Sequence, residues 1–135
     1  MATGLYTARN ASALARALFA TQKDAPPILR LAIAHAAVNR YLYERDLDPG
    51  ADFVSVVADE ELFECWGDPR SFSECTGDAR YGECFAAAKG VLSGGLGDPT
   101  NCSRRFHARF RSPVWAIGLV PAARIGGYLF YNNCD

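Results

Sequence analysis

The segment from Pro26 to Leu42 constrains the fold more than any other part of the sequence, because its residues recur with the period of an α-helix. Pro26 and Pro27 suit the first helical turn, where the missing proline amide leaves no hydrogen bond unmade. The predicted interior face is Ile28, Leu31, Ala32, His35, Val38, Asn39 and Leu42. Further alanines at positions 34, 36 and 37 would allow neighbouring helices to approach closely. We therefore predict a helix at the centre of a packed core.

Two polar residues interrupt this face. Asn39 on a core-facing side is best explained as a structural clamp that bonds the backbone of a neighbouring loop. His35 is interpreted as a hydrogen-bonded core histidine rather than a catalytic one.

Shorter helices are predicted on both sides of this element. Asn10 or Ser12 can cap a helix that runs to about Thr21, after a loose lead-in over residues 1–10. Residues 81–92 have a helical apolar period and are followed by Ser93 and two glycines, which end a helix. Residues 53–57 fit either a strand or a buried helix end, and residues 59–80 are irregular.

The end of the chain changes to a strand-like pattern. Asp98 to Asn101 form a predicted turn, and apolar residues then alternate at Phe106, Ala108 and Phe110, and again at Tyr128 and Phe130. Helices followed by a small C-terminal sheet predict the α+β class. At 135 residues, we expect one domain over positions 1–135.

Composition excludes several classes of function. The net charge of −1 creates no field that favours nucleic acid, so we predict no nucleic-acid partner. No apolar run reaches the length of a transmembrane helix, so we predict no membrane insertion. The first residues contain no apolar core of a secretory signal, which favours a virion-associated protein or release by a non-secretory route, with a cytoplasmic protein as the alternative.

The cysteines do not follow a zinc-binding pattern, and we predict no metal and no cofactor. One or two disulfides or five reduced thiols are both open, because the count is odd. The five positions are Cys65, Cys75, Cys84, Cys102 and Cys134.

Five segments resemble one known family, in the same order and over about residues 14–132. They are AHAAVNR (34–40), LFECW (62–66), GDPTNCSRRFH (97–107), SPVWA (112–116) and ARIGGYLFY (123–131). They resemble, respectively, the AAVxLNR, QFSCW, DPT-x-GA-x-x-FH, P-x-WA and RIG-x-H-x-FY segments of the cell wall hydrolases related to spore-cortex-lytic enzymes. The resemblance implies a compact lysozyme-like fold that acts on the glycan strands of peptidoglycan.

The same resemblance implies that the catalytic acid is absent. The family glutamate lies in a GEARGE-like loop, and counting back from Asn39 places it at Thr21, in the segment 20–25. Threonine does not titrate in the useful range. The family's QFSCW glutamine falls on Leu62, so a second polar site position is also apolar.

Glycosidic cleavage needs a carboxylic acid that an apolar pocket keeps protonated. Asp24 and Glu64 are the two candidate replacements, although the sequence favours an exposed position for Glu64 between buried Phe63 and Cys65. Cys102 and His107 form a weaker candidate pair for nucleophilic chemistry. Candidate substrate-binding residues are the sugar-stacking aromatics and the groups that bind carboxylates: Trp66, Asp98, Arg104, Arg105, Phe106, His107, Tyr128 and Tyr131.

These observations predict a peptidoglycan-directed protein with a degenerate active site, and its partner would be the glycan strands. The lost acid suggests a phage virion or tail component, which would also contact other virion proteins. The alternatives are an active lytic transglycosylase or muramidase that uses Glu64 or Asp24, and a structural adaptor that binds no glycan.

Overall fold

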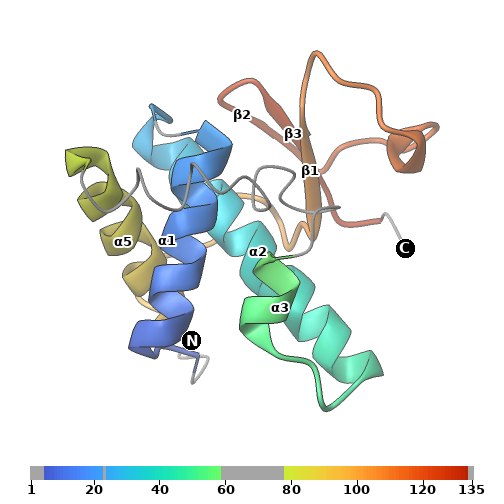
Figure 1. The fold of residues 1–135 in the computed structure, drawn as a ribbon. Coiled ribbons are helices and arrows are strands. Elements are labelled where there is room, and N and C mark those ends of the chain that lie inside the picture. Colours follow the sequence, from blue (N-terminus) through green and yellow to red (C-terminus); the bar gives the residue numbers. More distant parts are fainter. Residues whose placement is uncertain (1–4, 23, 59–77, 134–135) are drawn as a thin grey trace.

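The computed structural model describes residues 5–22, 24–58 and 78–133. Helices come first and a three-stranded antiparallel sheet comes last (Figure 1). The elements are α1 (Ala8–Gln22), α2 (Pro27–Leu47), α3 (Phe53–Val57), α5 (Ala79–Leu92), β1 (Arg105–Ala108), the 3₁₀ helix η2 (Val114–Ala116), β2 (Ala123–Ile125) and β3 (Tyr128–Tyr131). The predicted α+β class is confirmed.

Helix α1 begins earlier than predicted. The Thr7 hydroxyl accepts a hydrogen bond from the Asn10 amide at 3.0 Å, so Thr7 rather than Asn10 or Ser12 caps the helix. The Asn10 side chain instead donates to the Leu5 carbonyl at 2.9 Å. Residues 8–10 are therefore helical, and the expectation of a loose lead-in up to residue 10 is wrong for them.

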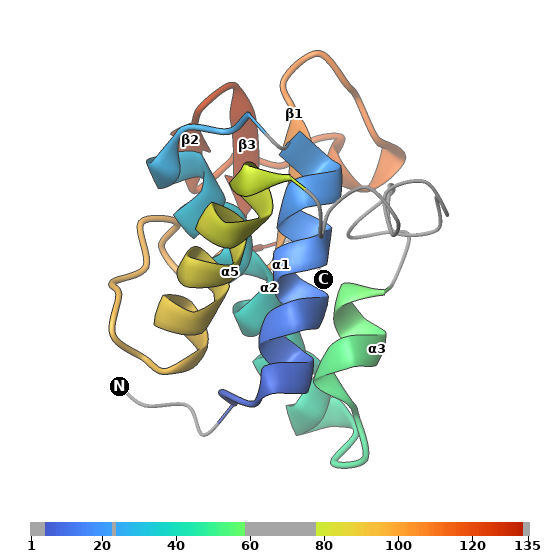
Figure 2. The same cartoon turned by 60° about the vertical axis from the view of Figure 1, so that its left-hand side comes forward.

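Helix α2 lies at the centre of the molecule and contacts α1, α3, α5 and strands β1 and β2 (Figures 1 and 2). Because neighbours surround it, its burial extends beyond a single stripe. Ile28, which the helical period assigned to the interior, is 49% exposed, whereas Leu29 beside it is 1% exposed. The prediction of close packing at the alanines is confirmed, since Ala32, Ala34, Ala36 and Ala37 are fully buried.

The other two helices settle open points. Residues 53–57 form helix α3, with Phe53 and Val57 buried one turn apart. Helix α5 begins at Ala79, two residues before the predicted start, because the Asp78 side chain caps it by accepting from the Arg80 amide at 2.8 Å. Gly94 follows the C-cap residue Ser93 and has a φ of +79°, which suits the predicted ending.

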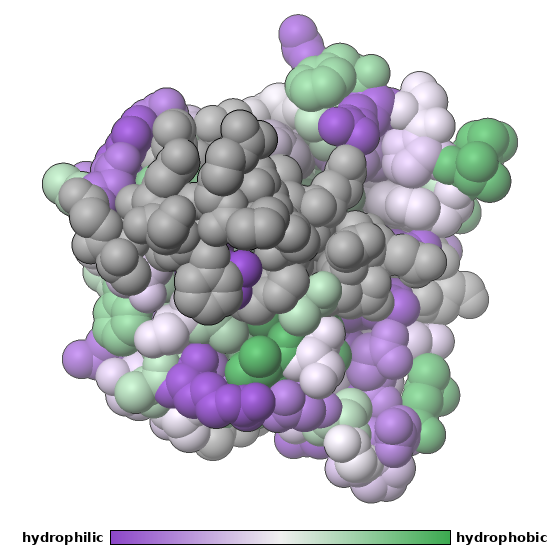
Figure 3. All heavy atoms as spheres, viewed as in Figure 1, coloured by the Kyte–Doolittle hydropathy of each residue, from purple (hydrophilic) through white to green (hydrophobic). Residues whose placement is uncertain are grey.

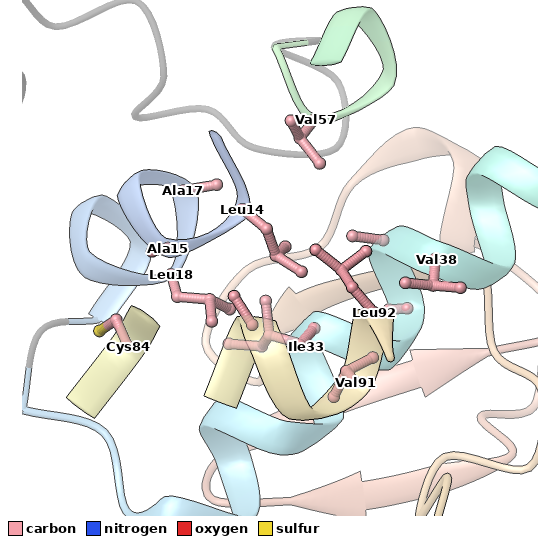
Figure 4. Packing of buried hydrophobic residues seen from close by; sticks show 14 of the residues in the cluster. Leu14, Ala15, Ala17, Leu18, Ile33, Val38, Val57, Cys84, Val91 and Leu92 are labelled. Atoms are coloured by element: carbon pink, nitrogen blue, oxygen red, sulfur yellow. The ribbon is translucent and has the colours of Figure 1, made fainter. Parts of the chain in front are cut away.

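The core joins the helices to the sheet. Figure 4 shows Leu14 and Leu18 of α1, Ile33 of α2 and Leu92 of α5 converging, and each is at most 2% exposed. Phe106 and Phe130 extend this cluster into the sheet. Cys84 is buried in it, and Cys102 is exposed. Cys65, Cys75 and Cys134 lie outside the described residues. Of the helices within the described ranges, none has the length and apolar character needed to cross a membrane.

Candidate functional site

The sheet has two chemically different faces. Its strand order is β1-β3-β2, and residues directly opposite one another in such pairs point to the same side. Phe106 pairs with Phe130 on the inner face, which packs on the helices. Arg105 pairs with Tyr131, and His107 with Leu129, so these four side chains share the outer face.

Four side chains gather on this outer face, and we call Arg105, His107, Trp115 and Tyr131 the aromatic–cationic cluster. Trp115 comes from η2 and meets the ring of Tyr131 edge-on, with 5.2 Å between centroids and 86° between planes. The His107 ring stacks on Tyr131 at 5.4 Å and meets Trp115 edge-on at 5.7 Å. The Arg105 guanidinium lies 4.9 Å from the centre of the Trp115 ring, in the range of a cation–π contact.

The 109–122 connection is what completes the cluster. It leaves β1 and returns Trp115 to the sheet, where the Trp115 ring meets that of Tyr131, which is 3% exposed although its strand position faces outward. Pro113 precedes η2, and the Ala116 amide bonds the Pro113 carbonyl at 3.0 Å, which fixes the turn that carries Trp115. The cluster therefore depends on segments far apart in the sequence.

Hydrogen bonds define the state of the histidine. Its Nδ1 lies 2.7 Å from the Ala108 carbonyl, which can only accept, so Nδ1 carries the proton. In the neutral ring, Nε2 then accepts from the Tyr131 hydroxyl at 2.9 Å. Burial raises the pKa of Tyr131, with Arg124 acting weakly in the opposite direction, so the phenol keeps its proton. Both ring nitrogens of His107 are engaged, and neither bonds Cys102.

These side chains offer chemistry that could bind a ligand. The half-buried rings of Trp115 and His107 can stack on a sugar ring, and Arg105 can pair with a carboxylate. Tyr131, which is 3% exposed, is the packed support of the cluster. Within the described ranges, no group of three or more His, Cys, Asp or Glu side chains is placed to hold a metal ion.

Asp98 is a structural residue in the turn before β1. Its carboxylate accepts from the Thr100 amide and hydroxyl at 2.8 and 2.6 Å and from the Cys102 amide at 3.2 Å. The Asn39 side chain donates to Asp98 at 3.0 Å and to the Ser103 carbonyl at 2.9 Å. Burial alone would raise the pKa of Asp98, but hydrogen bonds from Thr100 and Asn39 outweigh it, so the pKa is lowered.

The prediction that Asn39 clamps a neighbouring loop is thus confirmed. His35 is also hydrogen-bonded, with Nε2 3.0 Å from the Leu96 carbonyl, as expected of a structural histidine. The carboxylate that the sequence offered for substrate binding at Asp98 has both oxygens committed to this turn.

The remaining binding candidates are divided between the two faces. Phe106 is 7% exposed, and its ring lies 5.7 Å from that of Phe130 and 6.1 Å from that of Tyr128. Strand alternation puts Phe106 and Tyr128 on the inner face. Phe106 is buried there, so its ring is not open to a sugar, whereas Tyr128 is half-buried and its sugar-stacking role stays a prediction. Arg104 points away from Arg105, and its guanidinium lies 4.4 Å from the centre of the Tyr43 ring on α2.

Thr21 and Asp24, the two described positions that the sequence placed at or near the catalytic acid, do not provide a buried carboxylic acid. The Thr21 hydroxyl donates to the Ala17 carbonyl one turn back in α1 at 2.7 Å. Asp24 forms an ion pair with Arg80, and its side chain is 66% exposed, which is not the apolar setting of a glycosidase acid. Glu64 and Trp66 lie outside the described residues.

Sequence reasoning missed Trp115 as a member of the site. The available signal was in the segment SPVWA, where Trp115 follows a turn fixed by Pro113 in an arginine-rich part of the sequence. Its partners could not be read from the sequence, because they depend on the return of the 109–122 connection to β3.

Comparison with known proteins assigns this chain to no family. No family model, no curated protein and no solved structure matches this chain.

Proposed function

We propose that this protein binds peptidoglycan through the aromatic–cationic cluster and has the lysozyme-like fold of the cell wall hydrolases without their glycosidase chemistry. The observation that carries the proposal is the outer face of the sheet, where Arg105 and His107 lie against Trp115 and Tyr131. Peptidoglycan offers matching chemistry: sugar rings that stack on aromatic groups, and lactyl or peptide carboxylates that pair with arginine.

The position of Thr21 supports a binding role over an enzymatic one. The family resemblance puts the catalytic glutamate there, and Thr21 lies at the C-terminal end of α1 with its hydroxyl bonded inside the helix. Asp24, three residues on, is exposed and ion-paired. A protein that keeps glycan contact and lacks the acid suits a part of a phage virion or tail, where binding to the wall is useful without cleavage.

Co-sedimentation with purified sacculi tests this proposal. The wild-type protein should pellet with the sacculi, and Trp115→Ala should weaken that binding about tenfold or more, as expected for a tryptophan at the centre of a contact. Tyr6→Ala is the matched control, because Tyr6 is a half-exposed aromatic with a cation, Lys89, 5.7 Å from its ring, at the start of the helical part.

Mass spectrometry of the supernatant separates binding from catalysis. The proposal expects no soluble muropeptides. Released muropeptides that disappear in Glu64→Gln or Asp24→Asn would establish an enzyme with a relocated acid. Failure of the wild-type protein to pellet would remove the glycan-binding role and leave the structural adaptor. Absence of the protein from purified phage particles would remove the virion role alone.

A further inference from the structure

The 109–122 connection displays apolar side chains that the proposed function does not use. Four of them are more exposed than any other large hydrophobic residue within the described ranges: Phe110 and Val114 at 84%, and Ile117 and Val120 at 74%. Side chains of this kind are normally withdrawn from water, so a set of four on one connection indicates a contact surface. Trp115, between them in the sequence, faces the sheet instead.

The connection has a defined shape that projects from the body. Local backbone hydrogen bonds hold it: the Arg111 amide bonds the Ala108 carbonyl at 2.9 Å, and the Leu119 amide bonds the Ala116 carbonyl at 3.1 Å. It extends beyond the sheet, away from the helices (Figure 1), and Gly118, with a φ of +81°, turns in open space. A stable protein contact needs about 800 Å² on each partner, which a broad face provides more readily than a projecting connection.

The sequence of the connection and of the residues on both sides of it carries charge of one sign. Residues 99–134 contain five arginines and no aspartate or glutamate, although the whole chain has a net charge of −1. Arg109, Arg111 and Arg124 are exposed on the connection or on β2. In Figure 3, apolar and hydrophilic side chains lie next to one another on the projecting part at the upper right. This combination is complementary to a surface that is anionic outside and apolar beneath.

We propose that the 109–122 connection docks on an anionic lipid surface. The apolar side chains of Phe110, Ile117 and Val120 enter the interfacial layer, and Arg109 and Arg111 pair with lipid phosphates, as in other interfacial segments. A membrane-spanning helix is not required for this contact. The sequence prediction of no membrane insertion considered only spanning segments, so this contact would revise it. The inference does not depend on glycan binding, because it uses different side chains.

Sedimentation with lipid vesicles tests the inference. The protein should pellet with vesicles that contain phosphatidylglycerol and remain in solution with phosphatidylcholine alone. Replacing Phe110, Ile117 and Val120 together with serine should weaken the association at least about tenfold, because the apolar area then stays in water. Leu47→Ser is the matched control, since Leu47 is 69% exposed at the end of α2 and should not matter.

Charge variants and alternative outcomes complete the design. Arg109→Gln and Arg111→Gln should each weaken binding about fivefold at low salt, and added salt should weaken the wild-type association. If circular dichroism shows that the triple serine variant is unfolded, Phe110→Ser alone replaces it in the vesicle experiment. No pelleting with anionic vesicles overturns the proposal, as does pelleting that the serine variants leave unchanged. Self-association that the serine variants abolish, without lipid binding, would instead assign the surface to a second copy. Sacculus binding is measured separately, so either proposal can fail alone.

Discussion

The helical part and the sheet part of this molecule use apolar residues in opposite ways. In the helical part, Leu14, Ile33 and Leu92 are at most 1% exposed, and the fully buried alanines of α2 let α1 and α5 pack closely against it. In the sheet part, only the inner face joins this core, while the connection beyond it leaves Phe110 and Val114 84% exposed. The difference separates the residues that stabilise the fold from apolar side chains that the fold leaves in water.

Charge follows the same division. Residues 99–134 contain no acidic residue, so residues 1–98 hold 14 of the 15 acids, and the fifteenth is Asp135. The two parts meet at the hydrogen bond between Asn39 and Asp98 and at Phe130, which packs in the shared core. Substitutions at these two contacts test the comparison.

The largest expected effect is at the joint inside the core. Phe130→Ala, at a position with no exposed surface, should lower the free energy of unfolding by about 3–5 kcal/mol. Phe110→Ala, at an 84% exposed phenylalanine of the same sheet part, should change it by no more than about 0.5 kcal/mol. Urea denaturation measures both, and equal losses would contradict the division.

The polar joint should come next. Asn39→Ala removes two donors and leaves the Ser103 carbonyl without this partner, so we expect a loss of about 1–3 kcal/mol. The control is Asn132→Ala, which removes a single bond to the Asn101 carbonyl near the surface and should cost about 0.5–1 kcal/mol. If the control costs as much in denaturation, Asn39 is not a special clamp.

The turn between β2 and β3 lies close to helix α2, so it offers a further test of how the sheet part packs on the helical part. Gly126 has a φ of +56°, and a Cβ there would lie 3.0 Å from the side chain of Leu29 on α2. Gly127 has a φ of +81° with open space around it. Both alanine variants bear about 1–2 kcal/mol of backbone strain, and Gly126→Ala should be the less stable by thermal unfolding because it also crowds Leu29. A reversed order would place the sheet differently against α2.

The smallest expected effect is the loss of the stability that the Asp98 carboxylate contributes when the pH is lowered. The pKa of Asp98 is lowered in the folded protein, so its contribution to stability is present above the unfolded pKa of about 4 and is lost as the pH falls through the folded pKa. Asp98→Asn should cost about 0.5–1 kcal/mol at neutral pH, since solvent screens this carboxylate. That cost should shrink below pH about 4. A difference that stays constant with pH would show that the charge is not involved.

Local signals were enough to predict much of the fold. The helical period and the two prolines located α2, and Asp98 with its neighbours marked the turn before the sheet. The clamp role of Asn39 followed from a polar residue on a core-facing side. The interior face of α2 was assigned wrongly at Ile28 because burial there depends on which neighbours surround the helix. The alternation predicted through Phe110 failed because β1 ends at Ala108.

The candidate site was harder to predict, because its geometry is non-local. Arg105 and His107 were singled out because their side chains can bond carboxylates, but Phe106 between them belongs to the opposite face once the strand forms. The contacts of Trp115 with Tyr131 require both the strand register and the return of the 109–122 connection. Periodicity within one segment does not contain that information.

The most direct test of peptidoglycan binding at the cluster uses the two histidines of the chain as internal reporters. His107 lies in the aromatic–cationic cluster, whereas His35 on α2 bonds the Leu96 carbonyl. Imidazole NMR signals are followed while soluble peptidoglycan fragments are added. We expect the His107 signal to shift with saturation while the His35 signal stays in place, and Trp115→Ala to raise the fragment concentration needed for saturation about tenfold or more. A His107 signal that does not respond to the fragments would contradict the assignment of the outer face as the glycan-binding site.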